Sequence, residues 1–230
     1  MIVVLIPTYN EAENIGELIQ EILSLQLPLK IIVVDDNSPD GTARIAEAAA
    51  KKTGKVVVIR RNERGRGTAG IRGFQEALKY KVTHIIEMDA DFSHDPSYIP
   101  ALMETAKKYD IAVGSRMISG GDTVDRSFFR NVLSSGGALF TRAVLGLSVL
   151  DAQSGYKCYR RRVIESMDFP RFVSHGYSIG AELLYRAKKQ GFTMSEIPIV
   201  FENRKRGKSK VTLREIVTSM LNVVRIRLER

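Results

Sequence analysis

Residues 30–42 read KIIVVDDNSPDGT, and this short stretch contains the unit from which the fold is built. Its four β-branched apolar residues, Ile31–Val34, predict a buried strand. Two acids and Pro39 end that strand, and the next three residues are typical of a helix start. The stretch therefore predicts a strand, a polar turn and a helix, in that order.

The first 115 residues repeat this unit. Short apolar runs predict further strands at residues 2–6, 56–59, 83–88 and 111–113. Apolar residues at helical spacing predict helices at residues 11–25, 42–52, a stretch ending near 80, and 96–108. Such alternation with short connections indicates an α/β fold, Rossmann-like, with a mostly parallel central sheet flanked by helices. Ligands of such sheets bind at the carboxyl ends of the strands.

The second half of the chain is less regular. Residues 117–130 are loop-like, and strands are predicted at residues 152–159 and 197–202. Helices are predicted at residues 131–147, 160–167, 178–190 and 213–224, the last of them strongly amphipathic. We expect one domain over residues 1–230, with a regularly alternating half at 1–115 and a less regular half at 116–230.

Composition narrows the class of protein. With 230 residues and 44% hydrophobic side chains, the chain can bury a core and is not wholly disordered. Its single cysteine, Cys158, excludes a disulfide framework and a cysteine-based zinc site. The net charge of +9 is unevenly placed, since the first 110 residues sum to −2 and the last 120 to +11. This asymmetry indicates a nucleic acid, a phosphorylated ligand or an anionic membrane as partner, or simply a solvated basic surface.

A pair of carboxylates, Asp89 and Asp91, follows the predicted strand at 83–88. Residues two apart in a strand point to the same side, so we expect the two acids to form a dense oxygen site. A hard divalent cation would neutralise them, and Mg2+ or Mn2+ commonly takes one or two protein carboxylates. The alternative is a solvated turn before the next helix. His94, nearby, is more often a packed turn residue than a ligand.

Two other strand ends carry polar residues. Asp36 is expected to meet a ligand and Asp40 to cap the next helix. At the first strand end, Tyr9 can lie against a base and Glu11 can contact a base or ribose, unless the segment is only a turn capped by Asn10. No P-loop motif occurs, so we expect any nucleotide to bind through these acids and a metal.

Six motifs in order resemble the GT-A glycosyltransferases of family 2, and within them the dolichyl-phosphate (polyprenyl-phosphate) mannosyltransferases. The motifs are Pro7–Glu11, Asp35–Thr42, Met88–His94, Gly114–Arg116, Asp151–Tyr156 and Arg204–Lys210. The resemblance covers essentially the whole chain. It implies a nucleotide-sugar half at residues 1–115 and an acceptor half at 116–230 that ends in the amphipathic helix. It implies inverting transfer of mannose from GDP-mannose to dolichyl (polyprenyl) phosphate, with Mg2+ or Mn2+.

The resemblance also implies roles for individual residues. The guanosine would be surrounded by Pro7, Tyr9, Glu11, Val34 and Asp36. Ribose, diphosphate and metal would meet Asp89, Ala90 and Asp91, with Asp89 and Asp91 as metal ligands. Donor phosphates would contact Arg116, Arg204 and Lys210, the last two on a basic loop that would close as a lid. The acceptor phosphate would lie near Arg130 and Ser134, which with Asp91 and Arg116 form the catalytic set. Some family members have Gln where Ser93 stands, so the third metal contact here is expected to be water.

The sequence does not assign a catalytic role to either of two acids in the second half, Asp151 and Glu182. Asp151 would orient the acceptor or cap a turn, since an acid near this region is the base in relatives with hydroxyl acceptors. Glu182, on a predicted helix, is expected to be structural.

The acceptor lipid lies in a bilayer, yet no stretch of the sequence is long and apolar enough to span one. Residues 131–147 and 211–228 are candidate interfacial helices, although core packing is the commoner role for their apolar residues. We expect a cytoplasmic protein, peripheral on the cytosolic face of a membrane, with a membrane-anchoring subunit as a further option and no nucleic-acid partner. The alternatives are transfer from UDP-glucose or another donor to a polyprenyl phosphate or sugar hydroxyl, and a non-catalytic nucleotide-sugar or nucleic-acid binder.

Overall fold

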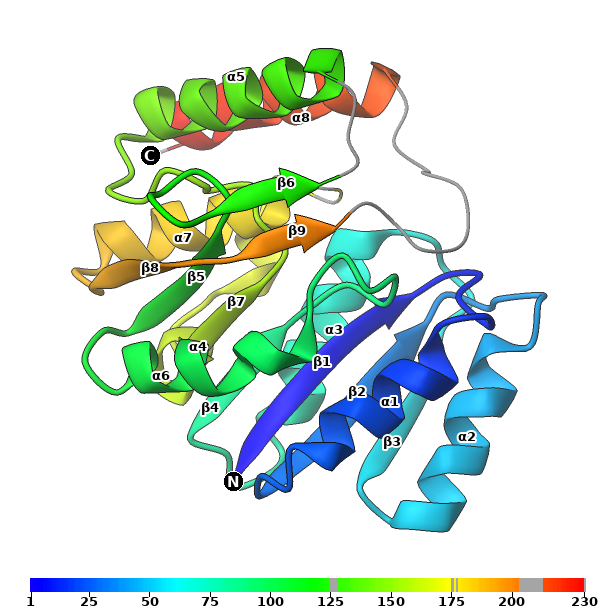
Figure 1. The fold of residues 1–230 in the computed structure, drawn as a ribbon. Coiled ribbons are helices and arrows are strands. Elements are labelled where there is room, and N and C mark those ends of the chain that lie inside the picture. Colours follow the sequence, from blue (N-terminus) through cyan, green and yellow to red (C-terminus); the bar gives the residue numbers. More distant parts are fainter. Residues whose placement is uncertain (125–127, 175, 177, 203–212, 230) are drawn as a thin grey trace.

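The apolar strands assemble into one seven-stranded sheet in the computed structural model (Figure 1). The structure describes residues 1–124, 128–174, 176, 178–202 and 213–229, with the backbone alone for 128–133 and 213–216. The strand order is β3-β2-β1-β4-β7-β5-β8. These strands are β1 (Ile2–Thr8), β2 (Leu29–Asp35), β3 (Val56–Arg60), β4 (His84–Glu87), β5 (Ile111–Ser115), β7 (Lys157–Arg160) and β8 (Met194–Pro198).

All neighbouring strands are parallel except β7, which lies antiparallel between β4 and β5. The five strands predicted in the first 115 residues are β1 to β5, so the predicted mostly parallel sheet is confirmed. A strand that is buried on both faces needs a continuous apolar sequence rather than an alternating one. The run Ile2–Ile6 meets this need, since every residue in it is buried.

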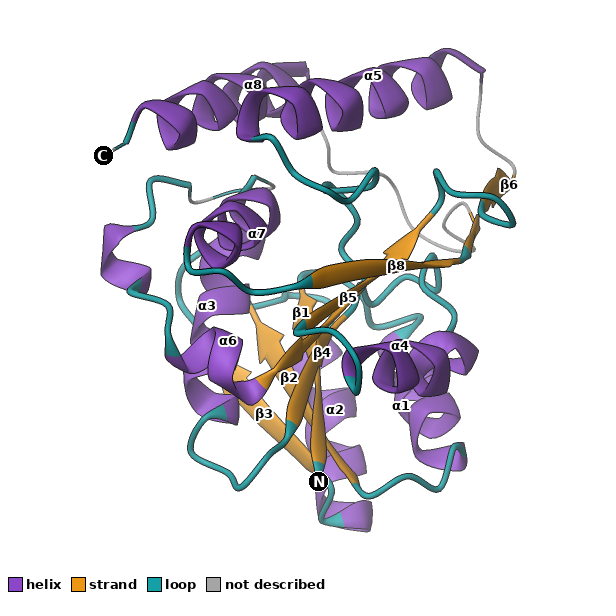
Figure 2. Ribbon diagram, turned by 90° about the vertical axis from the view of Figure 1, so that its left-hand side faces the viewer, coloured by secondary structure: helices purple, strands orange, loops and turns teal. Residues whose placement is uncertain are grey.

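Helices cover both faces of the sheet, and each face has its own apolar core (Figure 2). Val3 and Leu5 of β1 point into one core, whereas Ile2 and Val4 point into the other. The first core includes residues of α3 (Arg66–Ala77), α6 (Arg161–Glu165) and α7 (Ile179–Lys189). The second includes residues of α1 (Ile15–Ser24), α2 (Thr42–Thr53) and α4 (Ile99–Ala106), the last preceded by the 3-10 turn η1 (Pro96–Tyr98).

Two long helices, α5 (Phe128–Leu145) and α8 (Leu213–Leu228), lie side by side at one end of the molecule (Figures 1 and 2). Leu145 of α5 and two residues of α8, Val223 and Ile226, join the core that contains α7. A second, two-stranded parallel sheet joins β6 (Asp122–Val124) to β9 (Val200–Glu202). A 3-10 turn, η2 (Phe169–Arg171), precedes α7.

Three local expectations for the second half are wrong. The stretch 197–202 is not one strand, because β8 ends at Pro198 and Ile199 separates it from β9. The stretch 152–159 forms a strand only from Lys157 onward, since a turn closes at Ser154 N–H, which donates to the Asp151 carbonyl. Residues 117–130 are not all loop, since they contain β6 and the start of α5.

The amphipathic helix predicted at 213–224 is confirmed as α8, but its apolar face points outward. The exposed apolar residues are Val217, Met220, Leu221, Val224 and Leu228. The buried positions are Ser219, Asn222, Val223 and Ile226. Asn222 donates to Ser178 Oγ at 3.2 Å, so the inward side of the helix contains polar residues beside Val223 and Ile226. The expectation that core packing accounts for most of these apolar residues is therefore wrong for α8.

Candidate active site

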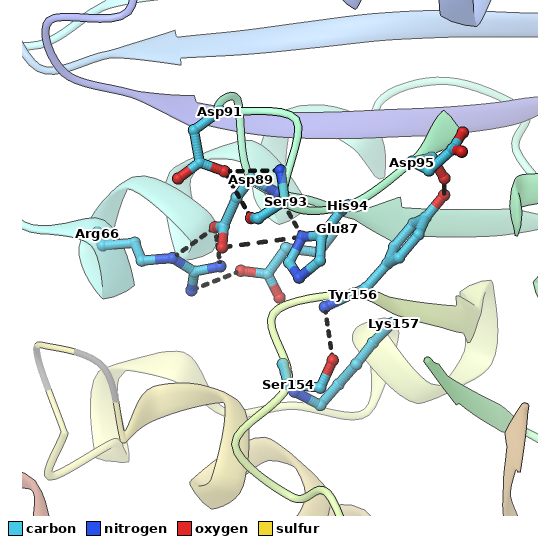
Figure 3. Close-up of polar contacts among 10 residues, drawn as sticks. All are labelled: Arg66, Glu87, Asp89, Asp91, Ser93, His94, Asp95, Ser154, Tyr156 and Lys157. Atoms are coloured by element: carbon cyan, nitrogen blue, oxygen red, sulfur yellow. Dashed lines mark hydrogen bonds and ion pairs between the residues drawn. The ribbon is translucent and has the colours of Figure 1, made fainter. Parts of the chain in front are cut away.

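The carboxyl ends of β1, β2 and β4 meet at one edge of the sheet, because these three strands are adjacent and parallel. The predicted polar clusters follow these ends. One premise was wrong: β4 ends at Glu87, so Asp89 and Asp91 lie in the bend after the strand rather than within it. Strand alternation therefore does not orient them. Their orientation comes from specific side-chain contacts (Figure 3).

Asp89 is held by an arginine from the start of α3. Arg66 donates to Asp89 Oδ1 from Nε at 3.0 Å and from Nη2 at 2.7 Å. The side chain of Asp89 is 31% exposed, so this carboxylate faces solvent while the arginine fixes it. A charge-assisted pair with two donors is both strong and directional.

Asp91 is almost fully buried and is fixed by its own turn. Its Oδ1 accepts from Ser93 N–H at 3.1 Å and from Ser93 Oγ at 2.5 Å. Ser93 therefore orients Asp91. Phe92, between them, has φ of +62°, a left-handed conformation that closes the turn.

The donor set suits a hard divalent cation. In the part of the chain that the structure describes, no three His, Cys, Asp or Glu side chains gather into a metal-binding group. Asp89 and Asp91 supply two carboxylates, and Mg2+ in nucleotide sites typically takes one or two carboxylates, with phosphate oxygens and water completing its shell. The residues present thus fit a cation that is shared with a diphosphate.

His94 is a packed turn residue, as expected. Its ring stacks on Tyr156 at 4.9 Å between centroids and meets the edge of Phe201 at 5.6 Å. His94 Nδ1 accepts the backbone N–H of Asp89 at 3.0 Å, which fixes the turn. Burial lowers the pKa of His94, against the raising effect of Asp89 and Asp91, so the neutral ring that this acceptor role requires is favoured.

Tyr9 and Glu11 follow the end of β1, whose last residue, Thr8, is paired with Asp35 of β2. The guanidinium of Arg64 stands 4.4 Å from the centroid of the Tyr9 ring and covers one of its faces. Glu11 is buried, and its Oε2 accepts from Asn14 at 2.9 Å. Asn14, not Asn10, stands before α1, while Asn10 has φ of +54°.

At the end of β2, Asp36 is buried against two partners. Its Oδ1 lies 2.9 Å from Arg61 Nε, and its Oδ2 accepts from Gly65 N–H at 2.8 Å. Burial raises the pKa of Asp36, while Gly65 and Arg61 oppose that rise. Asp40 stands one residue before the N-cap, Gly41, and its Oδ1 accepts the N–H of Thr42, the first residue of α2, at 3.0 Å.

Three of the residues expected to surround the nucleotide, Pro7, Val34 and Ala90, can contact a ligand mainly through their backbone groups. The side chain of Val34 is fully buried in one core and that of Ala90 in the other. Pro7, half-buried, is paired with Val34 across β1 and β2. Any contact that Val34 or Ala90 makes with a ligand would therefore come from its peptide groups.

Arg116 follows β5 and forms a buried ion pair with Asp151. Its Nε and Nη2 each lie 2.7 Å from a different carboxylate oxygen of Asp151. Burial alone would raise the pKa of Asp151, but the hydrogen bonds from Arg116 hold it below its ordinary value. The arginine also stacks on Phe201 at 5.1 Å. Asp151 thus orients Arg116.

The structure describes the remaining residues implied by the resemblance only in part. Ser134 is half-buried on α5. Arg130 also belongs to α5, but its side chain is outside the described set. Arg204 and Lys210, with the whole basic loop, lie outside the described residues. Glu182 is structural as expected, since its carboxylate accepts from the N–H groups of Val173 and Ser174 at 3.0 and 2.8 Å.

Sequence reasoning missed four charged residues around the carboxylates: Arg61, Arg66, Glu87 and Lys157. Glu87 and Lys157 are 3% and 1% exposed. One signal for them was present in the sequence. Glu87 and Lys157 are ionisable residues within predicted strands, and buried charges are rare unless they are paired.

The chain belongs to glycosyl transferase family 2, whose model matches residues 3–167. It is 34% identical over 225 residues to an undecaprenyl-phosphate mannosyltransferase of Micrococcus luteus, covering 97% of this chain and 93% of the relative. It is 37% identical over 234 residues to a polyprenol monophosphomannose synthase of Mycolicibacterium smegmatis, covering 99% and 88%.

Solved structures share the fold. A glucosyl-3-phosphoglycerate synthase from Mycobacterium tuberculosis, in complex with Mn2+, UDP and glucosyl-3-phosphoglycerate, has a TM-score of 0.71 at 19% identity, covering 99% of this chain and 78% of that one. A mannosyltransferase from Pyrobaculum calidifontis, in complex with GDP-Man and Mn2+, has a TM-score of 0.60 at 16% identity, covering 99% and 72%. The predicted GT-A fold is therefore confirmed.

Proposed function

We propose that this protein transfers mannose from GDP-mannose to dolichyl (polyprenyl) phosphate, with inversion at the anomeric carbon. The observation that carries the proposal is similarity over nearly the whole chain to two relatives whose names state mannosyl transfer or phosphomannose synthesis on a polyprenyl carrier. We further propose that residues 1–230 act as one domain, with the donor at 1–115 and the acceptor at 116–230.

The donor would bind at the carboxyl edge of the sheet. Tyr9, Glu11 and Asp36 would contact the guanosine there, with Pro7, Val34 and Ala90 presenting backbone. Asp89 and Asp91 would hold Mg2+ or Mn2+, and when bound the cation would supply electrostatic stabilisation of the diphosphate leaving group. The fixed orientation of both carboxylates supports this assignment.

Arg116 would stabilise the negative charge that grows on the leaving diphosphate. Its orientation by Asp151 supports this role, because a cation held in place before the reaction pays little reorganisation as charge develops. Arg204 and Lys210 would add positive charge at the same diphosphate.

The acceptor needs no strong general base. A phosphate monoester has a second pKa of about 6, so at neutral pH its oxygen is already an anionic nucleophile. Consistent with this, Asp151 is buried with its carboxylate committed to Arg116, which makes it unsuited to remove a proton. Arg130 and Ser134 of α5 would bind the acceptor phosphate.

Peripheral binding to the cytosolic face of a membrane would bring the enzyme to its lipid. No helix in the described ranges is both long and apolar enough to cross a bilayer. The outward apolar residues of α8 support binding at the membrane surface, and Leu139 of the neighbouring helix α5 is also exposed, at 57%. Arg225 and Arg227, also exposed near the end of α8, would contact anionic headgroups.

A donor panel tests the proposed specificity. GDP-mannose, GDP-glucose, UDP-glucose and UDP-galactose would each be incubated with the protein, a polyprenyl phosphate and Mn2+, and the lipid product detected by mass. The proposal expects hexosyl lipid from GDP-mannose well above the other donors. Preference for a UDP-sugar would show that the proposed donor, GDP-mannose, is wrong. Transfer to a free sugar but not to the lipid would show that the proposed acceptor, polyprenyl phosphate, is wrong.

A further inference from the structure

A cluster of buried charges lies directly behind Asp89, and we call Arg66, Glu87 and Lys157 the Arg66 cluster (Figure 3). The guanidinium of Arg66 is shared between two acids. Nε and Nη2 donate to Asp89 Oδ1 at 3.0 and 2.7 Å, and Nη1 donates to Glu87 Oε1 at 3.3 Å. The arginine therefore links the end of β4 to the carboxylate that follows it.

Lys157 lies opposite Glu87 on the neighbouring strand, β7. The two residues are register partners in the antiparallel pair of β4 and β7, so their side chains lie on the same face of the sheet. The ammonium of Lys157 is fully enclosed and donates to the carbonyl of Ser154. Charges consequently alternate from Lys157 through Glu87 and Arg66 to Asp89.

Glycines from three segments make room for the cluster. A Cβ on Gly155 would lie 2.6 Å from Arg66 Nη2 and 3.2 Å from Asp89 Oδ2. A Cβ on Gly70 would lie 3.3 Å from Glu87 Oε1, and one on Gly180 would lie 3.2 Å from Lys157 Nζ. The chain thus lacks a side chain at each point where one would press on these charges.

We propose that Arg66 is a positioning residue that fixes the Asp89 carboxylate for the donor and its cation, with Glu87 holding the guanidinium of Arg66 in turn. This inference rests on the proposed function, in which Asp89 is a metal and donor ligand. Both guanidinium donors converge on Asp89 Oδ1, and two directed donors fix the position of that oxygen more closely than a single ammonium group would. Partners that orient a metal ligand typically change affinity or activity by about 10–100-fold when removed.

Two substitutions disturb the contact without removing a charge from the cluster. Gly155→Ala inserts a methyl group against the guanidinium, at a position where φ is not left-handed. Arg66→Lys keeps the positive charge but loses the two guanidinium donors to Asp89 Oδ1. We would measure Mn2+ binding by electron paramagnetic resonance, with and without GDP, and the KM for GDP-mannose. Both variants should bind Mn2+ about tenfold more weakly and raise this KM similarly, with an unchanged midpoint of thermal unfolding.

Two matched controls separate this role from general damage. Gly136→Ala places a methyl group on α5 where nothing lies within 4 Å. Arg60→Lys alters an arginine of β3 whose exposed partner is Glu47. Both should bind Mn2+ as the unchanged protein does.

The outcomes separate the two claims. If the unchanged protein binds Mn2+ and Arg66→Lys binds it equally well or more tightly, the role of Arg66 is wrong while the metal site stands. If the unchanged protein binds no Mn2+, with or without GDP, the proposed metal site itself is wrong. Should Gly155→Ala fail to fold, Arg66→Lys decides the question alone.

Discussion

Asp151 forms a bidentate ion pair with Arg116, in which each carboxylate oxygen lies 2.7 Å from a different guanidinium nitrogen. The acid is itself anchored in a loop whose N–H groups at Leu150 and Asp151 donate to Glu196, at 2.9 and 3.0 Å. The pair thus fixes an arginine at the end of β5 against a rigid support. It also gives Asp151 a clear structural task, which the sequence alone left open.

Breaking this pair should strongly destabilise the protein. Asp151→Ala leaves the Arg116 cation buried without its partner, and such changes typically cost about 3–5 kcal/mol. Urea unfolding would measure the loss. In a double-mutant cycle, Arg116→Met with Asp151→Leu should cost clearly less than the sum of the two single changes. Additive costs would contradict the pairing. Glu47→Gln, at the exposed partner of Arg60, is the control and should leave the unfolding free energy almost unchanged.

Lys157 should make stability rise with pH above neutrality. Burial lowers its pKa to about 8, from 10.5, against the attraction of Glu87, Asp151 and Asp89. As pH rises from 8 towards 10, the folded protein releases this proton before the unfolded chain does. The unfolded chain then binds more protons, so the free energy of unfolding increases.

Lys157→Met isolates this effect, because the variant and the unchanged protein have all other titrating groups in common. The difference in unfolding free energy, unchanged protein minus variant, should increase between pH 7 and pH 10 by roughly 2–3 kcal/mol. Urea unfolding at four pH values would provide it. A difference that is flat or falls over this range would contradict a depressed lysine pKa.

Asp91→Asn tests the carboxylate that Ser93 orients. The amide keeps the shape of the side chain but loses the charge that the proposed cation requires. We expect kcat/KM for mannosyl transfer to fall at least about 100-fold, equivalent to about 2.7 kcal/mol of transition-state stabilisation. Steady-state rates at varied Mn2+ would show this, with thermal unfolding as a check of folding. Glu104→Gln, an exposed acid of α4, serves as the control. A rate near that of the unchanged protein would remove Asp91 from the metal site.

The apolar stripe of α8 should drive binding to lipid. Replacing Val217, Leu221 and Leu228 by Ser removes side chains that are 51–74% exposed in the protein alone. Each leucine that enters the interface contributes about 1.5–3 kcal/mol when fully buried, so binding should fall by more than tenfold. Sedimentation with anionic vesicles measures it, and Ile45→Ser on α2 is the apolar control. Equal vesicle binding by the triple variant would locate the membrane contact elsewhere.

The first half of the fold could be predicted because its signals are local. A run such as Ile2–Ile6 is continuous and apolar, and burial on both faces of a parallel sheet requires no more than that. The polar residues after such runs then necessarily gather at one edge. The sequence therefore located Asp36, Asp89 and Asp91 without any knowledge of packing.

The contacts that orient these acids depend on tertiary structure. Arg116 and Asp151 are 35 residues apart, and no local pattern pairs them. Lys157 faces Glu87 only because β7 inserts antiparallel between β4 and β5. The outward face of α8 could not be read from periodicity, since the same spacing describes an apolar face that packs inward and one that points to solvent.

The most direct test of the central claim is mannosyl transfer itself. The protein would be incubated with radiolabelled GDP-mannose, polyprenyl phosphate in vesicles and Mn2+, and the label extracted into organic solvent. We expect a labelled lipid that forms with time, disappears with EDTA, returns with excess Mn2+ or Mg2+, and carries mannose in the inverted configuration. No labelled lipid under these conditions, or the same yield with EDTA present throughout, would contradict it.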